Sequence, residues 1–379
     1  MRVAVILTAR PSWAKLQTVV AALVARGVDV QLIACASALL ERYGAVVNVV
    51  RREFPDVPIE EVWSTYEGAT LLTSAKETGA LLTELSSVLS RLRADACVVC
   101  ADRHEVLAAA QAAAYLHLPV VHLQGGERSG SIDDRVRDAI TQLADVHCVA
   151  TKRAMMRVYG LTGDEKAIRL TGCPSIDLAK QAMDDPPVTA EELGGAGAAI
   201  DLSQPFVVVL QHPVTSEAAE AGLQMETVLT ACRGWRVVVF WPGEDAGADA
   251  ASKVIRTYQE DMHTVRNLPP RRFLRLLTQA ACLVGNSSAG IRECSYLGVP
   301  VVNVGTRQSG RECGPNLVDV LNGLGEDITK AIARQMAHGR YPSSKLYGSG
   351  DAGEKIAEVI VGKAAAVSTG VHRVLHKTT

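Results

Sequence analysis

The chain has 379 residues, more than twice the roughly 150 residues of an ordinary domain, so we expect two domains. Its 48% hydrophobic and 21% charged residues are typical of a globular protein and exclude a disordered one. The formal net charge of −2 is too balanced for a protein whose affinity depends on neutralising a nucleic-acid backbone, so we expect neither DNA nor RNA as a partner.

No apolar run approaches the roughly 20 residues of a membrane span, and the apolar run at the start is too short for a signal peptide. We therefore predict a cytoplasmic protein without a membrane partner. The nine cysteines lie mostly in apolar runs, as reduced cysteines do. Cys97 and Cys100 have a spacing seen in metal and redox sites, but the run ACVVC reads as a strand that turns them to opposite faces. We assign no metal site and no cofactor.

In chain order, the first half alternates short apolar runs with amphipathic stretches, which indicates βα units around a parallel sheet. The strands should be nearly all apolar because helices cover both faces of such a sheet. We predict strands at residues 3–7, 28–34, 96–99, 120–123, 147–150 and 168–170, and helices at 13–26, 71–93, 105–116 and 133–143. Gly27 is a plausible end for the first helix.

A segment rich in Asp, Pro, Gly and Ala, residues 184–198, indicates a domain boundary, after which the βα pattern restarts. Its glycine cluster at 194–197 follows no strand and precedes no Lys-Ser/Thr pair, so we interpret it as linker rather than phosphate loop. Further strands are predicted at 206–210, 236–240, 282–285 and 301–304, and helices near 218–232, 273–281 and 291–297. The predicted divisions are a Rossmann-like domain at 1–180, a linker at 181–204, a second Rossmann-like domain at 205–352, and a C-terminal helix and tail at 353–379.

Two such doubly wound domains leave a cleft between the carboxyl ends of their sheets, where open α/β folds bind ligands. After the first strand, Arg10 lies in the turn and Lys15 about one helical turn further on. A fixed guanidinium beside a helix N-terminus favours an anion such as phosphate. A solvated surface Arg and Lys is the alternative interpretation.

The next two strand ends bring more polar residues to the same edge. Asp102 follows one strand, Gln124 opens a glycine-rich loop after the other, and Asp133 and Arg137 lie four apart on the following helix. Part of this pattern would be explained by an N-cap at Asp102, by a capping box between Ser131 and Asp134, and by a surface ion pair between Asp133 and Arg137. They do not explain why these side chains should converge, as carboxylates set for proton transfer in a cleft would.

The second domain repeats the arrangement. His212 follows the strand at 206–210, and we expect it to face the cleft. The run from Gly285 through Ser287 and Ser288 is a strand, a turn of small residues and a helix start, which supplies hydroxyls and backbone N–H groups for a pyrophosphate. Glu293, five residues after Ser288, could accept hydrogen bonds from a sugar diol. An ordinary Ser cap is the alternative, but a sugar nucleotide is the ligand we infer.

With these residues in place, the sequence resembles the UDP-N-acetylglucosamine 2-epimerase family, in particular the epimerase half of the bifunctional UDP-GlcNAc 2-epimerase/ManNAc kinase. The resemblance covers nearly the whole chain and includes no sugar-kinase domain. The matching stretches are residues 102–103, 122–127 (HLQGGE), 129–134 (SGSIDD), 172–175 (GCPS), 211–215 (QHPVT), 285–290 (GNSSAG) and 305–308 (GTRQ).

The resemblance implies a two-domain GT-B-like fold and inversion at C2 by elimination of UDP to a glycal followed by re-addition, without nicotinamide. It places Asp102, Asp133 and Asp134 in the acid/base set with Arg137 as electrostatic support, and Gln124 and His212 beside them. It implies a UDP-sugar site formed by Arg10, Lys15, Arg103, His212, Gly285, Ser287, Ser288 and Arg307, with Glu293 at the ribose. It also implies a homodimer or homotetramer.

Two residues depart from the family pattern. The family normally has a catalytic glutamate where this chain has Gln124, and an amide cannot act as a general acid or base. Ser12 stands where relatives near the kinase-fused enzyme carry an acidic residue. We expect a hydrolysing epimerase that releases UDP and ManNAc. The alternatives are a non-hydrolysing epimerase that releases UDP-ManNAc, a glycosyltransferase of the same fold, and a catalytically impaired UDP-sugar binder.

Overall fold

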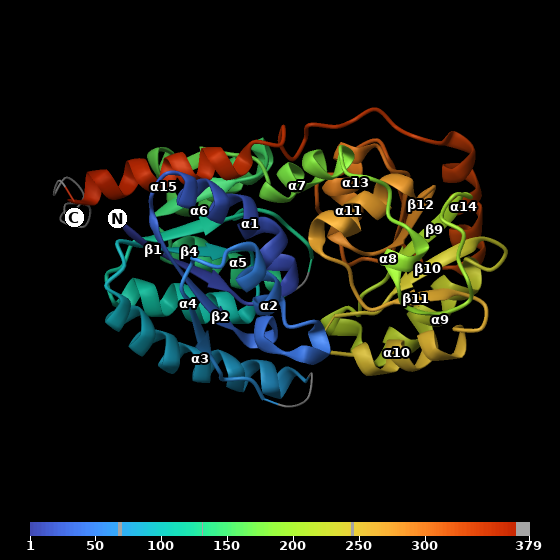
Figure 1. The fold of residues 1–379 in the computed structure, drawn as a ribbon, viewed down its shortest axis with the longest axis horizontal. Coiled ribbons are helices and arrows are strands. Elements are labelled where there is room, and N and C mark those ends of the chain that lie inside the picture. The colour runs from blue at the N-terminus through green and yellow to red at the C-terminus, as the bar shows by residue number, and fades with distance from the viewer. Residues whose placement is uncertain (67–69, 131, 244–245, 369–379) are drawn as a thin grey trace.

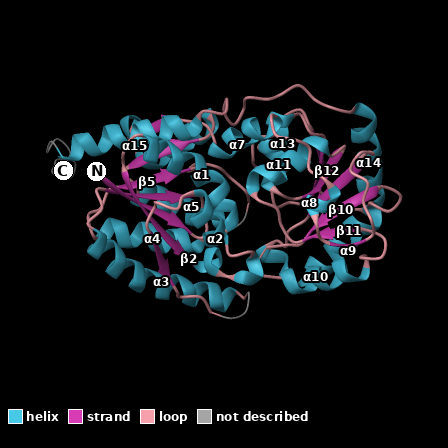
Figure 2. Cartoon of the chain, in the orientation of Figure 1, coloured by secondary structure: helices cyan, strands magenta, loops and turns pink. Residues whose placement is uncertain are grey.

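Two seven-stranded sheets, each between two layers of helices, make up the computed structural model of this chain (Figures 1 and 2). The structure describes residues 1–66, 70–130, 132–243 and 246–368, with the backbone alone at 215 and 363–368. None of the helices within these ranges is long and apolar enough to cross a membrane. The predicted class, two α/β domains of the doubly wound kind, is confirmed.

The first sheet is parallel throughout and has the strand order β3-β2-β1-β4-β5-β6-β7. Its strands are short and mostly buried, as expected for a sheet covered on both faces. They are β1 (Arg2–Leu7), β2 (Asp29–Cys35), β3 (Ile59–Val62), β4 (Ala96–Cys100), β5 (Val120–Leu123), β6 (Val146–Val149) and β7 (Ile168–Leu170).

Successive side chains of β1 and β4 enter two different cores. Val3 and Val5 pack with α1 (Arg10–Ala25), α2 (Val46–Glu53) and α15 (Ala352–Ser368). Ala4 and Ile6 pack on the opposite face with α3 (Leu71–Leu92), α4 (His104–Tyr115) and part of α5 (Asp133–Leu143). Cys97 and Cys100 fall into different cores, as their spacing predicted. Helix α6 (Lys152–Thr162) covers the β6 and β7 end of the sheet.

The second sheet has the order β14-β13-β12-β9-β10-β11-β8, with β8 alone antiparallel. Its strands are β8 (Ala196–Gly197), β9 (Phe206–Leu210), β10 (Arg236–Phe240), β11 (His263–Val265), β12 (Cys282–Gly285), β13 (Val301–Val304) and β14 (Leu317–Val320). Helices α9 (Ala221–Ala231), α10 (Ala248–Thr257) and α14 (Gly325–His338) cover one face. Helices α7 (Pro174–Met183), α11 (Pro270–Gln279) and α13 (Glu293–Leu297) cover the other.

Two helices join the domains. Helix α7 spans the predicted boundary at 180 and packs into the core of the second domain, while the chain returns so that α15 lies along α1 (Figure 1). The buried carboxylate of Asp177 in α7 accepts backbone hydrogen bonds from Ala352 (2.9 Å) and Gly353 (2.7 Å) and one from the Thr18 hydroxyl (3.0 Å). This carboxylate therefore fastens the start of α15 to both α7 and α1.

The predicted strands are confirmed to within one or two residues, and Gly27 ends α1 with a φ of +71°. The segment predicted as linker contains α8 (Ala190–Leu193) and β8, so its glycine cluster is partly an edge strand. The predicted helix at 291–297 is broken at Arg292, between α12 (Ser288–Ile291) and α13. Short 3₁₀ turns occupy Ala36–Leu39, Glu41–Tyr43, Glu165–Ala167 and Thr215–Glu220, the last replacing the start of the helix predicted from 218.

Candidate active site

The candidate residues lie where the chain reverses its direction across each sheet. In the first sheet β1 adjoins β4, and in the second β9 adjoins β12, so that successive connections leave in opposite directions. Such points form crevices at the carboxyl ends of the strands. Arg10 and Asp102 follow β1 and β4, and His212 and Ser287 follow β9 and β12. These four predicted site residues therefore follow the strands at the two switch points.

Arg137 is the centre of the carboxylate group in the first domain. Its side chain is 1% exposed and forms ion pairs with Asp102 and with Asp134, the latter at 2.7 Å. The same guanidinium donates to the backbone carbonyl of Glu127 at 2.5 Å. The prediction that Asp102 and Arg137 converge is confirmed. The interpretation as a surface ion pair is wrong, because this arginine is buried.

Asp134 fastens the glycine-rich loop to α5. Its carboxylate accepts backbone hydrogen bonds from Ser129 and Gly130, both at 2.8 Å, and a hydrogen bond from the Ser129 hydroxyl at 3.1 Å. The helical ion pair of Arg137 is thus formed three residues back, at Asp134, where the sequence suggested Asp133 four residues back. Asp133 is half-buried at the first position of α5. The predicted capping box involves Ser131, which lies outside the described residues.

A buried histidine shapes the turn that carries Asp102. The Nε2–H of His122 in β5 donates to the carbonyl of Ala101 at 2.9 Å, and Nδ1 lies 3.3 Å from the Thr141 hydroxyl. Ala101 has a φ of +71°, a strained value for a residue with a side chain. Burial lowers the pKa of His122 to about 4, so the ring is neutral at pH 7. The neutral ring therefore holds the strained turn immediately before Asp102.

Gln124 points into a neutral buried chain of side chains. Its Nε2 lies 2.7 Å from the Sγ of Cys173, which in turn lies 2.9 Å from the Ser175 hydroxyl. Burial raises the pKa of the Cys173 thiol, so the thiol is protonated at neutral pH. Gln124 Oε1 is buried and makes no hydrogen bond within the described part of the chain. Gln124, which replaces the family glutamate, thus contacts a thiol that in turn contacts a hydroxyl. None of these contacts brings Gln124 to the Arg137 group, so the predicted convergence of Gln124 with that group is not seen in them.

A second group of charges joins the two domains, and it was not predicted from the sequence. Glu127, in the glycine-rich loop, pairs through one oxygen with Arg292 at 2.5 Å and with Arg311 of the second domain. Burial alone raises the pKa of Glu127, but the two guanidiniums outweigh it and hold the value at about 2. Lys15 lies within the electrostatic reach of Arg292 and Glu127, and burial lowers its pKa. These residues lie in or near the motifs that match the family, but no local sequence pattern indicates that they pair with one another.

Arg10 has a structural partner in the second domain, and Ser12 has one within its own turn. The Arg10 guanidinium donates to the carbonyl of Leu268 in the second domain at 2.5 Å. Ser12 is buried and caps α1, accepting from the Ala9 backbone at 3.0 Å and donating to the Ala9 carbonyl at 2.6 Å. Arg10 therefore lies where the two domains meet, and Ser12 serves the helix that follows it.

The loops after β9 and β12 are bound to each other by one asparagine side chain. The Asn286 amide donates to the carbonyl of His212 and accepts from its backbone N–H, both at 2.7 Å. Arg307 donates to the Asn286 carbonyl at 3.3 Å. At Gly285, φ is +134° and an added Cβ would lie 2.3 Å from the Leu210 carbonyl, so only glycine fits there. These contacts bring His212, Gly285 and Arg307 together.

The two predicted serines come directly after Asn286 in the chain, and Glu293 lies five residues after Ser288. The Ser287 side chain caps α12, while the Ser288 hydroxyl accepts a hydrogen bond from Arg292 at 3.3 Å. Glu293 is largely buried, and its Oε2 makes no hydrogen bond with any described residue. An acceptor buried without a partner suits a ligand hydroxyl, because burying it unpaired costs about 1–3 kcal/mol.

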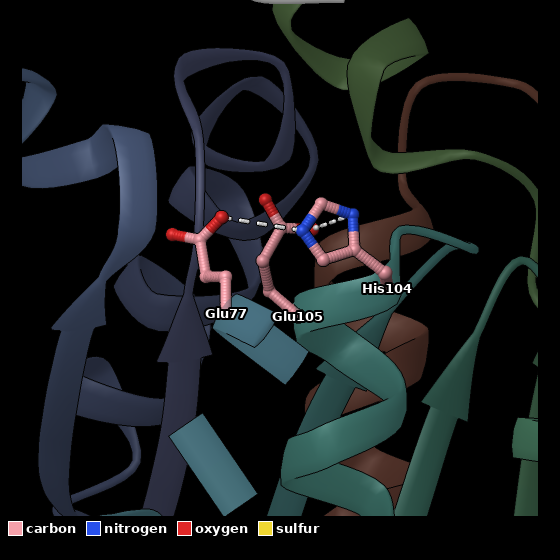
Figure 3. Close-up of side chains that lie close together, drawn as sticks. All are labelled: Glu77, His104 and Glu105. Carbon is pink, nitrogen blue, oxygen red and sulfur yellow. Dashed lines mark hydrogen bonds and ion pairs between the residues drawn. The ribbon is translucent and has the colours of Figure 1, made fainter. Parts of the chain in front are cut away.

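Arg103 belongs to a cluster of charges at the start of α4. Its guanidinium contacts both carboxylate oxygens of Glu105, at 3.0–3.1 Å. His104 lies 3.3 Å from Glu77 of α3 and 3.4 Å from Glu105, and the three side chains point toward one another (Figure 3). Their ligand atoms are close enough to hold a metal ion. Because Arg103 already occupies the Glu105 carboxylate, we interpret the cluster as an ion-pair network that fixes the turn after Asp102.

Comparisons with known proteins identify the family of this chain. The sequence model of the UDP-N-acetylglucosamine 2-epimerase family matches residues 21–361. A UDP-N,N'-diacetylbacillosamine 2-epimerase (hydrolyzing) of Legionella pneumophila is 31% identical over 76% of each chain. A UDP-N-acetylglucosamine 2-epimerase of Neisseria meningitidis is 29% identical over 88% of this chain and 87% of its own.

Solved structures share the fold. The Neisseria meningitidis UDP-GlcNAc 2-epimerase bound to UDP-GlcNAc superposes with a TM-score of 0.78 and 17% identity, over 96% of this chain and 100% of that one. The Methanocaldococcus jannaschii enzyme in complex with UDP-GlcNAc and UDP also gives 0.78, with 18% identity and the same coverage. The match of the family model to nine-tenths of the sequence decides the assignment: this chain belongs to the UDP-N-acetylglucosamine 2-epimerase family.

Proposed function

We propose that this enzyme is a hydrolysing UDP-N-acetylglucosamine 2-epimerase, which converts UDP-GlcNAc and water into ManNAc and UDP. The observation that carries the proposal is the placement of two chemically different groups at the two crevices. Carboxylates surround Arg137 in the first domain, and hydroxyls, His212 and Glu293 lie at the second. One group suits proton transfer and the other suits a nucleotide diphosphate.

The reaction needs a base at C2 and a stabilised leaving group at C1. No carbonyl acidifies the C2 proton, so its removal must accompany cleavage of the C1–O bond, which gives a glycal and UDP. Water then adds its hydroxyl to C1, and a proton is added to C2 from the opposite face. The product is ManNAc, and the proton balance is kept by the carboxylates.

We assign removal of the C2 proton to Asp133, with Asp102, Asp134 and Arg137 as the group that positions it. A second acid, on the opposite face of the sugar, then delivers the new proton to C2. Asp102 and Asp134 both pair with Arg137, and Asp134 also holds the glycine-rich loop, so these two carboxylates are fixed in place. Gln124 carries no titratable group and contacts the thiol of Cys173. It is therefore assigned to substrate positioning.

We assign UDP to the second crevice. Ser287, Ser288 and His212 would contact the diphosphate, and Glu293 would accept from the ribose. Lys15, Arg10, Arg103 and Arg307 supply positive charge along the path between the domains, where negative charge grows on the leaving UDP. Gly285 lets the backbone approach closely at this point.

A second substrate is favoured by one comparison. The Legionella relative is named for UDP-N,N'-diacetylbacillosamine, and its name includes hydrolysis. Both substrates undergo the same C2 chemistry, so the carboxylate group does not discriminate between them. The sugar pocket around Gln124 and Cys173 would have to make the choice.

Nuclear magnetic resonance in D2O tests these proposals together. The purified protein is mixed with UDP-GlcNAc or UDP-N,N'-diacetylbacillosamine, with no acceptor added, and proton and phosphorus spectra are followed. Free UDP with a C2-deuterated free sugar supports the hydrolysing epimerase. Deuterated UDP-ManNAc would identify the non-hydrolysing reaction, and a requirement for an acceptor would identify a glycosyltransferase. Binding without any turnover would identify an impaired UDP-sugar binder.

We also propose a cytoplasmic homodimer or homotetramer. Trp63, Tyr66, Leu71 and Leu72 are all exposed where β3 leads into α3, and a second copy would cover these apolar side chains. All nine cysteines are free thiols, eight of them buried, which suits a reducing compartment. Light scattering of the Leu72→Glu variant beside the native chain would test the interface, because an unchanged mass would exclude this surface.

A further inference from the structure

We propose that Glu127 is a positioning residue that links occupation of the UDP crevice in the second domain to the geometry of the carboxylates in the first. This inference rests on the proposed function, since it takes the second crevice as the UDP site. Glu127 is 5% exposed and lies between the two groups of site residues. Its side chain contacts the group in the second domain, and its backbone carbonyl contacts the group in the first domain.

The side chain of Glu127 is held from the second domain. One η-nitrogen of Arg292 donates a hydrogen bond to the Glu127 carboxylate at 2.5 Å, and the other donates a hydrogen bond to the Ser288 hydroxyl at 3.3 Å. Arg311, from the loop after β13, pairs with the same carboxylate oxygen. Arg292 therefore touches both a proposed diphosphate contact and Glu127, and any movement of its planar guanidinium changes both contacts.

The backbone of Glu127 is held from the first domain. Its carbonyl accepts from Arg137, and Arg137 pairs with Asp102 and Asp134. Asp134 in turn binds the backbone of Ser129 and Gly130 in the same loop. A shift of Glu127 would thus move Arg137 and the loop together, because each is bonded to the next.

Unpartnered atoms indicate that the connection is incomplete without a ligand. Glu127 Oε1, Arg292 Nε and Arg311 Nε are buried and make no hydrogen bond within the described ranges. Buried polar groups are normally paired, so these three atoms are an unsatisfied set at one point between the domains. Two guanidiniums face one carboxylate there, which leaves positive charge available to an anionic diphosphate.

UDP draws Arg292 toward its phosphates and thereby adjusts Glu127, Arg137 and the loop at residues 124–130. Spatial connection alone does not establish coupling, so the test must measure it. Hydrogen exchange of peptides covering 124–134 is followed by mass spectrometry with and without UDP. The native chain should show protection of this first-domain loop when UDP binds.

The decisive variant is Glu127→Gln, which keeps the size of the side chain and removes its charge. UDP should still bind it, with a dissociation constant by calorimetry within about threefold of the native value, while protection of the loop by UDP is lost. The kcat should fall by about 10- to 100-fold with a much smaller change in KM, because a displaced reacting group costs rate rather than binding. Glu127→Asp should restore part of the kcat.

Asp138→Asn is the matched control. Asp138 pairs with Arg128 at 2.8 Å, and this ion pair joins α5 to the same loop through two residues that both belong to the first domain. This variant should keep both the UDP-dependent protection and the kcat. If Glu127→Gln also keeps the protection, or loses kcat only as much as Asp138→Asn does, Glu127 has no coupling role. If the native chain does not bind UDP at all, the proposed function fails first and this role fails with it.

Discussion

Two buried histidines should make the first domain sensitive to mild acid. His122 and His147 occupy paired positions of β5 and β6 and are almost completely buried. Burial lowers the pKa of each from the ordinary 6.5 to about 4. The unfolded chain therefore binds protons as the pH falls below 6.5 while the folded chain does not, and stability is lost between pH 6.5 and pH 4.

The size of the loss follows from the two pKa values. One such histidine costs about 2 kcal/mol of stability between about pH 7 and pH 5, and two cost about 4 kcal/mol. His147 is the better one to replace, because its Nδ1 has no hydrogen-bond partner among the described residues, whereas both His122 nitrogens have close polar neighbours. In His147→Gln the loss over the same pH range should fall by about 2 kcal/mol.

Urea unfolding at the two pH values provides the assay, with hydrogen exchange of β5 and β6 peptides used to follow the first domain separately. The control is His117→Asn, because His117 is exposed and has a φ of +53°, which asparagine tolerates. It should lose as much stability as the native chain. If His147→Gln loses as much stability in acid as the native chain, burial of a neutral His147 does not cause the sensitivity.

Other substitutions test the site directly. Asp102→Asn should lower kcat strongly and destabilise the first domain by about 2 kcal/mol, because it removes one of the two carboxylates on buried Arg137; unchanged kinetics would refute the assigned group. Ser288→Ala combined with Glu293→Ala should weaken UDP binding in calorimetry, and an unchanged dissociation constant would exclude the proposed nucleotide crevice. Gln124→Glu should raise kcat if a missing carboxylate limits the rate, and lower activity would show that the neutral Gln124–Cys173 contact is required. Gly285→Ala should destabilise the second domain by about 3 kcal/mol, since its methyl would lie 2.3 Å from the Leu210 carbonyl. Thermal melting measures both variants, and Gly325→Ala, whose methyl would lie 3.6 Å from the nearest side chain, should be tolerated.

The sequence was sufficient to predict the central strands because their apolar runs are determined by burial on both faces. The strands that it missed have weaker patterns. β3 has the sequence IEEV and β14 the sequence LVDV, both at sheet edges where polar side chains reach solvent. β8 has only two residues, which no periodicity can reveal. The packing of α15 against α1 was also beyond local patterns, because it joins segments more than 300 residues apart.

The site shows the same division. Strand ends placed Asp102, His212 and Ser287 correctly, because parallel strands deliver their carboxyl ends to one edge. Helical spacing suggested Asp133 as the partner of Arg137, yet the ion pairs go to Asp134 and Asp102. Spacing indicates which residues share a helix face, but tertiary contacts decide which of them meet. The pairs of Glu127 with Arg292 and Arg311 span 165 and 184 residues, so no sequence period relates them.

The replacement of the family glutamate by Gln124 is best understood from its surroundings. The amide lies in a buried chain with a protonated thiol and a hydroxyl, all neutral, while Lys15 and Arg292 lie within electrostatic reach of the Cys173 thiol. Asp102 pairs with Arg137, and Asp134 pairs with Arg137 and also binds the loop, so both carboxylates have structural roles. Removal of the C2 proton would then depend on Asp133, at the start of α5. The rate of this step would depend on how rigidly Arg137 and Glu127 hold the start of α5 relative to the UDP crevice.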